Sequence, residues 1–111
     1  MHMEDYQKLA ITTAIYPKEQ GLVYTALGLC GEAGEVAEKI KKYIRDDGDI
    51  EVLRTNVSKE LGDVLWYIAN LAHELNLDLG TIASDNYLKL KSRQERNVLS
   101  GDVSCILIRK S

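Results

Sequence analysis

The chain has 111 residues, a hydrophobic fraction of 45% and a formal net charge of −3. This length suits a single domain, and the absence of a basic surplus argues against non-specific nucleic-acid binding. No apolar run approaches the roughly 20 residues of a membrane span, and the acidic N-terminus (residues 1–5) is unlike a secretory signal. The two cysteines, Cys30 and Cys105, have no metal-binding spacing. We therefore expect a cytoplasmic protein with reduced thiols.

Hydrophobic periodicity predicts a first helix over about residues 3–15, which ends before Pro17 because proline disfavours helical geometry in the preceding residue. A second helix follows, and Gly48 in the polar turn after it is a natural C-terminal cap. Cys30 falls on the apolar stripe of this helix, so we expect a buried thiol. The stripe recurs at steps of three and four residues and consists of Leu22, Ala26, Leu29, Ala33, Val36, Ile40 and Ile44.

A third helix is predicted to begin after Asp49, a suitable N-cap, and to end near Asn76 or Asp78. Its apolar stripe has the same spacing and consists of Ile50, Leu53, Val57, Leu61, Val64, Ile68, Leu71 and Leu75. A fourth helix starts after Asp78 or Thr81. Segment 103–108 is apolar and forms either a short strand or an extended arm. The fold class predicted is therefore all-α, a bundle of four helices over about 3–97 with a tail over 98–111, in one domain.

One acidic phrase occurs twice, 28 positions apart: Glu32-Ala33-Gly34-Glu35-Val36 in the second helix and Glu60-Leu61-Gly62-Asp63-Val64 in the third. Acids three residues apart share one side of a helix. At about 100° per residue, each pair holds the same position relative to the apolar stripe of its own helix. A short turn favours antiparallel packing, which would bring the four carboxylates face to face.

Four carboxylates this close resist joint ionisation unless a cation compensates them. A single pair of this kind is usually a solvated helix face, but the repetition favours a metal site. Gly34 and Gly62 weaken the two helices, which suggests close approach of backbone or ligand. Ligands that are all oxygen suit Mg²⁺ or Mn²⁺. Iron and zinc are disfavoured because no histidine or cysteine lies in either phrase, and His73 lacks an acid three residues before it.

Mg²⁺ held by carboxylates commonly acts on phosphates, so basic residues are expected nearby. Lys89 and Arg93 share a face of the fourth helix with Asn86, either as a phosphate-binding set or as an ordinary solvated face. Lys39 lies on the acidic side of the second helix and either pairs with Glu35 or reaches a phosphate.

Aromatic residues follow the second acidic pair. Tyr67 lies near the Glu60 side of the third helix, where it could line a pocket and stack on a base. Trp66 is better explained as an aromatic residue of the core or of a subunit interface. The chain has neither a Ser/His/Asp or Cys/His set nor a P-loop, so the expected nucleophile is a water molecule bound to the metal.

The two phrases and the segment Asn86 to Arg93 resemble the all-α nucleotide pyrophosphohydrolases, the superfamily of MazG-like enzymes and dimeric dUTPases. The hallmark of that family is ExxE, a spacer and ExxD, and the similarity covers about residues 3–102. The resemblance implies a MazG fold and Mg²⁺-dependent hydrolysis of nucleoside triphosphates to monophosphate and pyrophosphate, in house-cleaning of the nucleotide pool.

The resemblance also assigns roles to residues of this chain and implies a homodimer or homotetramer. Lys89 and Arg93 would bind phosphates, and Glu35 is our choice for the carboxylate that accepts a proton from water. The metal ligands it implies are Glu32, Glu35, Glu60 and Asp63. The apolar tail departs from the polar ends of short relatives. It motivates the alternative of a helical-bundle module that binds a nucleotide or protein without turnover.

Overall fold

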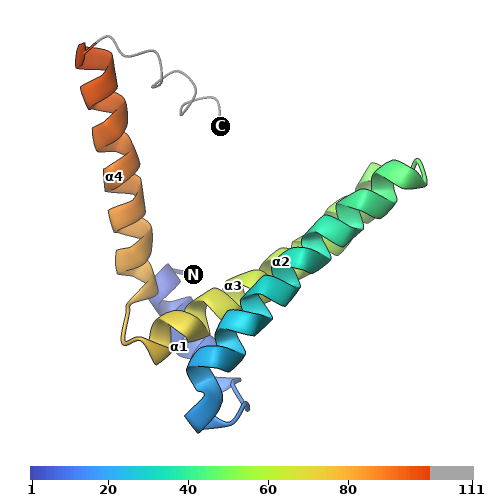
Figure 1. Ribbon diagram of the computed structural model, residues 1–111, viewed down its shortest axis with the longest axis horizontal. Coiled ribbons are helices and arrows are strands. Elements are labelled where there is room, and N and C mark those ends of the chain that lie inside the picture. The colour runs from blue at the N-terminus through green and yellow to red at the C-terminus, as the bar shows by residue number, and fades with distance from the viewer. Residues whose placement is uncertain (101–111) are drawn as a thin grey trace. The chain divides into compact units, whose positions relative to one another are not determined.

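The computed structural model describes residues 1–100, with side chains described as far as residue 97. The helices confirm the all-α prediction, and the described residues contain no strand (Figure 1). The predicted arm at 103–108 lies outside this range. The elements are α1 (Met3–Thr12), a 3-10 turn η1 (Lys18–Gln20), α2 (Gly21–Arg45), α3 (Ile50–Glu74) and α4 (Leu79–Ser100).

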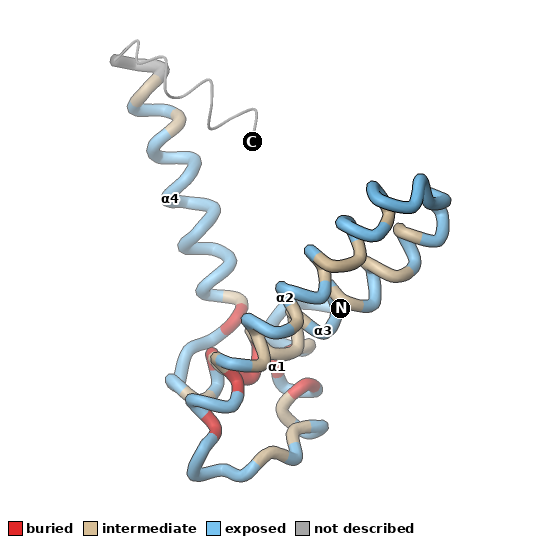
Figure 2. Tube along the Cα trace, turned by 45° about the vertical axis from the view of Figure 1, so that its right-hand side comes forward, coloured by how far each residue is buried: buried red, intermediate tan, exposed pale blue. Residues whose placement is uncertain are grey.

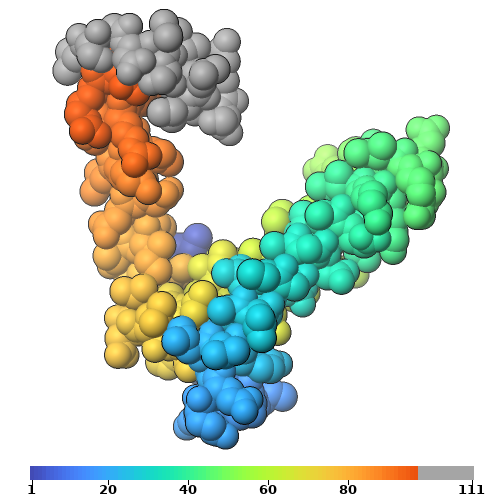
Figure 3. All heavy atoms as spheres, in the orientation of Figure 1, coloured from blue at the N-terminus to red at the C-terminus, as the bar shows by residue number. Residues whose placement is uncertain are grey.

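The chain divides into two compact units, Met1–Asp78 and Leu79–Ser111. In the first unit, α2 and α3 form a long antiparallel hairpin, and α1 packs against α3 (Figure 1). The atoms of α2 lie directly against those of α3 along this hairpin (Figure 3). The described part of the second unit is the helix α4. No helix among the described residues combines the length and the apolar character of a membrane span.

Local sequence explains where the helices end. Asp49 caps α3 as predicted, since its Oδ1 accepts a hydrogen bond from the Glu51 amide at 2.8 Å. Asn76 adopts a left-handed conformation, with a φ of 56°, and stops α3. After α2, however, the left-handed residue is Asp47, with a φ of 51°, and not the predicted Gly48. Gly48 instead donates its amide to the Tyr43 carbonyl at 3.0 Å, which closes a Schellman motif around Asp47.

Helix α1 is shorter than predicted and ends at Thr12. The hydroxyls of Thr12 and Thr13 donate to the carbonyls of Leu9 and Ala10, at 2.6 and 2.7 Å. Threonine hydroxyls that bond to nearby carbonyls compete with continuation of a helix. Pro17 therefore lies five residues beyond the end of α1, in the connection to η1.

Small residues set the register of α2 against α3. A Cβ atom added at Gly21 would collide with the Glu74 carboxylate, and one added at Gly28 would collide with the Tyr67 ring. Seven residues forward along α2, from Gly21 to Gly28, therefore correspond to seven residues back along α3, from Glu74 to Tyr67. Four residues further in each direction, Glu32 lies level with Asp63.

The predicted apolar stripes are only partly buried. The face of α2 that meets α3 includes Gly21 and Gly28, so much of the apolar stripe beside that face remains exposed. Leu22 is 51% exposed and Ile44 is 72% exposed. The thiol of Cys30 is also exposed and not buried, because it too lies away from α3.

The buried core of the first unit is small and lies where α1 meets the C-terminal half of α3 (Figure 2). Its apolar side chains are those of Ala10, Ala69 and Ala72. Gln7 anchors α1 there, with Nε2 donating to the carbonyls of Ala69 at 3.2 Å and Leu77 at 3.0 Å. The site described next lies along the hairpin beside this core.

Candidate active site

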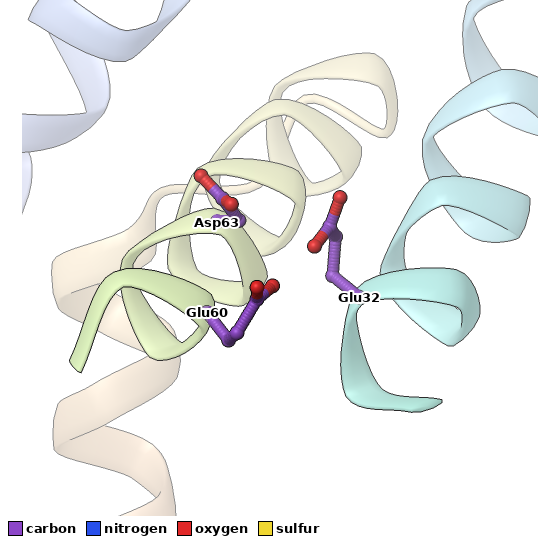
Figure 4. Close-up of side chains that lie close together, drawn as sticks. All are labelled: Glu32, Glu60 and Asp63. Carbon is purple, nitrogen blue, oxygen red and sulfur yellow. The ribbon is translucent and has the colours of Figure 1, made fainter. Parts of the chain in front are cut away.

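Three carboxylates meet across the hairpin, Glu32 from α2 and Glu60 and Asp63 from α3. Each offers an oxygen, and these oxygens all lie within 4.8 Å of one another. Glu32 points toward α3, and the carboxylate of Glu60 is turned toward it (Figure 4). We call these residues the acidic cluster. The register of the two helices explains why these carboxylates come together. Gly28 packs on Tyr67, and Glu32 lies one turn, or four residues, beyond Gly28 on α2.

The electrostatics of the cluster indicate uncompensated negative charge. The pKa of Glu32 is raised by burial, by a hydrogen bond with Glu60 and by the charges of Asp63, Glu60 and Glu35. Among the described residues, no lysine or arginine forms a salt bridge with the three clustered carboxylates. A divalent cation would supply the missing charge, and a ligand set made only of oxygen suits Mg²⁺ or Mn²⁺. The donor set therefore fits the predicted metal.

The fourth predicted ligand, Glu35, is not in the group of oxygens within 4.8 Å of one another. Its side chain is exposed on α2, one turn beyond Glu32. Three residues after Glu32, the side-chain direction on the helix differs from that of Glu32 by about 60°. Glu35 therefore lies beside the face of α2 that meets α3. It remains close enough for its charge to raise the pKa of Glu32.

The glycines inside the two acidic phrases face open space in the described structure. A Cβ atom added at Gly34 or Gly62 would meet no atom of the described structure within 4 Å. The close approach of backbone or ligand suggested at these glycines therefore has no partner among the described residues, and both alternatives stay predictions.

An aromatic cluster adjoins the carboxylates. The Tyr67 ring lies edge-on to Trp66, with centroids 5.0 Å apart, and tilted toward Tyr24 at 6.4 Å. Tyr24 stacks on Tyr16 at 5.1 Å. The pKa of Tyr67 is raised by burial, by Tyr24 and by the charges of Glu32 and Asp63. Tyr67 thus borders the acidic cluster and is the first of a row of neighbouring rings that includes Tyr24 and Tyr16.

Trp66 has a structural role beside this row. Its indole Nε1 donates to the Thr13 hydroxyl at 2.7 Å. This bond ties the end of α1 to α3 and fits the interpretation of Trp66 as a packing residue. It also holds one wall of the aromatic cluster in place.

Sequence reasoning did not single out Tyr6, Tyr16 or Tyr24. The pKa of Tyr6 is raised by burial and by the charge of Asp63, so α1 also contributes a side chain near the acids. Tyr24 lies two turns before Glu32 on the same helix, and that spacing could have identified it. Tyr16 lies in the connection between α1 and η1, where helical periodicity carries no information.

The predicted basic residues are distributed differently. Lys39 lines a pocket of about 250 Å³ at the end of the hairpin, together with Lys42 and Tyr43. Asn86, Lys89 and Arg93 are exposed on α4. Their spacing of three and four residues puts them on one face of that helix, and their roles remain predictions.

Comparison with known proteins supports the predicted family. A family model described as the MazG nucleotide pyrophosphohydrolase domain matches residues 20–98, which include both acidic phrases. The gene 37 protein of Mycobacterium phage L5 is 47% identical over 109 residues, covering 91% of this chain and 96% of the phage protein. That name states no activity. No solved structure shows significant similarity to the chain. The resemblance drawn from the paired motifs is thereby confirmed.

Proposed function

Because the chain belongs to the family of MazG nucleotide pyrophosphohydrolase domains, we propose that it is a divalent-metal-dependent nucleoside triphosphate pyrophosphohydrolase. The reaction converts a ribo- or deoxynucleoside triphosphate and water into the monophosphate and pyrophosphate. The preferred metal is Mg²⁺, with Mn²⁺ as a substitute. A role in removing unwanted nucleotides from the pool is consistent with this chemistry.

The acidic cluster is the observation that carries the proposal. Three carboxylates from two helices converge within 4.8 Å, and the pKa of one of them is raised by its neighbours. A fold maintains such crowding at a cost in stability, so the arrangement is better explained by a bound cation than by a solvated surface. Glu32, Glu60 and Asp63 would hold the metal. When bound, the metal neutralises phosphate charge and activates water for attack.

The other residues bind and orient the substrate. Glu35, exposed beside the cluster, is proposed to accept a proton from the attacking water. Tyr67 offers an aromatic face next to the carboxylates. Side chains with hydrogen-bond donors are proposed to bind phosphate oxygens. The positively charged candidates are Lys39 on α2 and Lys89 and Arg93 on α4, and the neutral amide of Asn86 on α4 is a further candidate.

Self-association is part of the proposal, because the exposed apolar surface of the first unit needs cover. Much of the predicted apolar stripe of α2 is exposed, including Leu22, Ile40 and Ile44. Exposed apolar surface on this scale commonly marks an interaction site. A second copy of the chain, giving a homodimer or a homotetramer, would bury it.

The test is pyrophosphate release from a panel of nucleoside triphosphates with Mg²⁺. Asp63→Asn removes a carboxylate of the cluster and should lower kcat/KM at least about 100-fold. Glu35→Gln removes the proposed proton acceptor and should lower kcat by about 100-fold or more. Glu51→Gln, at an exposed position on α3 paired with Arg54, is the matched control and should leave kcat/KM unchanged.

Metal binding gives a second measurement on the same proteins. Mg²⁺ at millimolar concentration should raise the melting temperature of the wild type by mass action, and this rise should be smaller in Asp63→Asn. Circular dichroism confirms that each variant keeps its helices. Full activity in Asp63→Asn, or an unchanged melting temperature with Mg²⁺ and nucleotide, would contradict the proposal.

A further inference from the structure

A pocket of about 250 Å³ lies between α2 and α3 at the end of the hairpin that carries the turn (Figure 1). Its lining includes Lys39, Lys42 and Tyr43 from α2 and Asn56 from α3. All of these residues belong to the first unit. We call this the tip pocket. Its volume is below that of sites for drug-sized ligands, so it suits a small ligand and not a whole nucleotide.

The tip pocket and the acidic cluster lie on the same side of the hairpin. Lys39 follows Glu32 by seven residues on α2, and Asn56 precedes Asp63 by seven residues on α3. Because seven residues make nearly two full turns, the two side chains of each pair leave their helix in nearly the same direction. The register of the hairpin also sets Lys39 level with Asn56. The tip pocket therefore extends the surface of the carboxylates by about 10 Å along the helix axis.

The lysines of the tip pocket are placed to face a ligand that extends from the acidic cluster. Side chains of a helix tilt toward its N-terminus, and in α2 that direction runs from the tip toward Glu32. Lysine carries its ammonium group on a flexible stem of four carbons. A chain of phosphates that begins at the carboxylates would therefore meet Lys39 first and Lys42, about one turn further along α2, next.

The two lysines of the tip pocket are not engaged by carboxylates of the protein. Within the described part of the chain, neither Lys39 nor Lys42 forms a salt bridge. Lys41, between them in the sequence, pairs instead with Glu38 at 3.3 Å and does not line the pocket. The ammonium groups of Lys39 and Lys42 are therefore available to a ligand that brings negative charge.

Two aspartates also line the tip pocket, and both are bonded within the protein. Asp46 accepts two hydrogen bonds from the Arg45 guanidinium, each at 2.7 Å. Asp49 caps α3, with Oδ1 accepting the Glu51 amide at 2.8 Å. The pKa of Asp46 is lowered chiefly by the hydrogen bond from Arg45, and the charge of Lys42 contributes less. Arg45 thus compensates this carboxylate and leaves the lysine for another anion.

In the other direction from the acidic cluster the hairpin offers a different surface. Tyr67 follows Asp63 by one turn on α3, and its ring lies 6.4 Å from the ring of Tyr24. Flat aromatic rings suit a nucleoside base, whereas ammonium groups suit phosphate oxygens. The acidic cluster therefore lies between an aromatic surface and the lysines of the tip pocket, and this order gives a nucleotide one direction along the hairpin.

We propose that the tip pocket binds the terminal phosphates of the substrate and holds the pyrophosphate product, through Lys39, Lys42 and the Asn56 amide. The inference rests on the proposed function, which sets the bond to be broken at the acidic cluster. Hydrolysis breaks the anhydride bond between the α- and β-phosphates and adds the elements of water across it. The β- and γ-phosphates then remain together as pyrophosphate between the metal and the lysines.

The first test measures hydrolysis of the nucleoside triphosphates by two lysine variants. Lys42→Met and Lys39→Met each keep a long side chain and remove its charge. Either change should raise KM about ten-fold or more, because one charge-assisted hydrogen bond to phosphate is lost. Lys41→Met removes the same charge on the other side of α2 and should leave KM unchanged. A wild-type KM in both Lys42→Met and Lys39→Met would overturn the inference.

Binding of inorganic pyrophosphate separates this inference from the proposed function, because it needs no turnover. In calorimetric titration with pyrophosphate and Mg²⁺, Lys42→Met should weaken binding about ten-fold or more, and Lys41→Met should bind as the wild type does. That pattern without hydrolysis of any triphosphate would leave the inference standing and reject the pyrophosphohydrolase. Hydrolysis by the wild type with equal pyrophosphate binding in all three proteins would reject the inference and leave the enzyme.

Discussion

At the scale of single residues, glycine serves two different purposes in α2. Gly28 makes room for the Tyr67 ring, and Gly21 does the same for the Glu74 carboxylate. Gly34 faces open space between the two acids of its phrase. The first two glycines therefore let α3 approach closely, whereas the third weakens its helix with no packing gain in this chain.

This difference predicts opposite effects of the same substitution. Gly34→Ala should raise the free energy of unfolding by about 1 kcal/mol, the difference in helix propensity. Gly28→Ala should lower it, because the methyl group would displace the Tyr67 ring. Urea denaturation followed by circular dichroism measures both. Equal and destabilising effects at the two positions would contradict this account.

Activity adds information on Gly34. If a ligand approaches the backbone between Glu32 and Glu35, Gly34→Ala should reduce kcat/KM while making the protein more stable. Such a combination would show that the glycine is kept for function.

At the scale of elements, the sequence predicts the helices well and their contacts less well. The N-cap at Asp49 and the end of α3 at Asn76 depend on the local backbone and side chains, so the sequence alone predicts them. The face that α2 presents to α3 depends on which side chains are small enough for close approach, and hydrophobic periodicity does not measure that. The predicted apolar stripe therefore stayed half exposed, with Cys30 among the exposed residues.

The candidate site follows the same division. Repetition of the acidic phrase at the same position of two antiparallel helices predicted that four carboxylates would meet. Three of them, Glu32, Glu60 and Asp63, come together, whereas Glu35 lies outside this group. A pocket of about 270 Å³ lined by Tyr16 and Glu74 was not predictable, since it depends on a connection without periodicity and on the packing of Glu74 against Gly21.

A buried polar side chain helps to hold helix α1 to α3. Gln7 is 6% exposed, and its amide donates to two carbonyls near the end of α3. Gln7→Ala should lower the free energy of unfolding by about 1–3 kcal/mol, because buried carbonyls lose their donor. Gln20→Ala is the control, since Gln20 is exposed and makes no side-chain capping bond. Urea denaturation of both variants makes the comparison, and equal midpoints would refute this role of Gln7.

At the scale of the whole molecule, the first unit has more apolar surface than its small core uses. The buried apolar side chains of that unit are three alanines, while Leu22 and Ile44 are more than half exposed. Burial of a larger fraction of the apolar surface stabilises a domain further. The self-association proposed above would bury this surface.

Sedimentation equilibrium should accordingly show a dimer or tetramer at micromolar concentration. Ile40→Lys places a charge in the exposed apolar stripe and should shift the protein toward monomer, with a lower melting temperature. Glu51→Lys changes charge at an exposed position of α3 and should leave the assembly intact. A wild type that sediments as a monomer would exclude self-association through this surface.

The register of α2 against α3 also limits where the chain can change in length. An insertion of one residue between Gly28 and Glu32 would turn every later position of α2 by about 100° and advance it by about 1.5 Å. Glu32 would then leave Glu60 and Asp63, although no residue of the cluster had been altered. The turn at Asp46–Asp49 lies beyond both acidic phrases, and extra residues there would form a longer loop. Related chains should therefore vary in length at the hairpin tip and keep the spacing from Gly21 to Glu32.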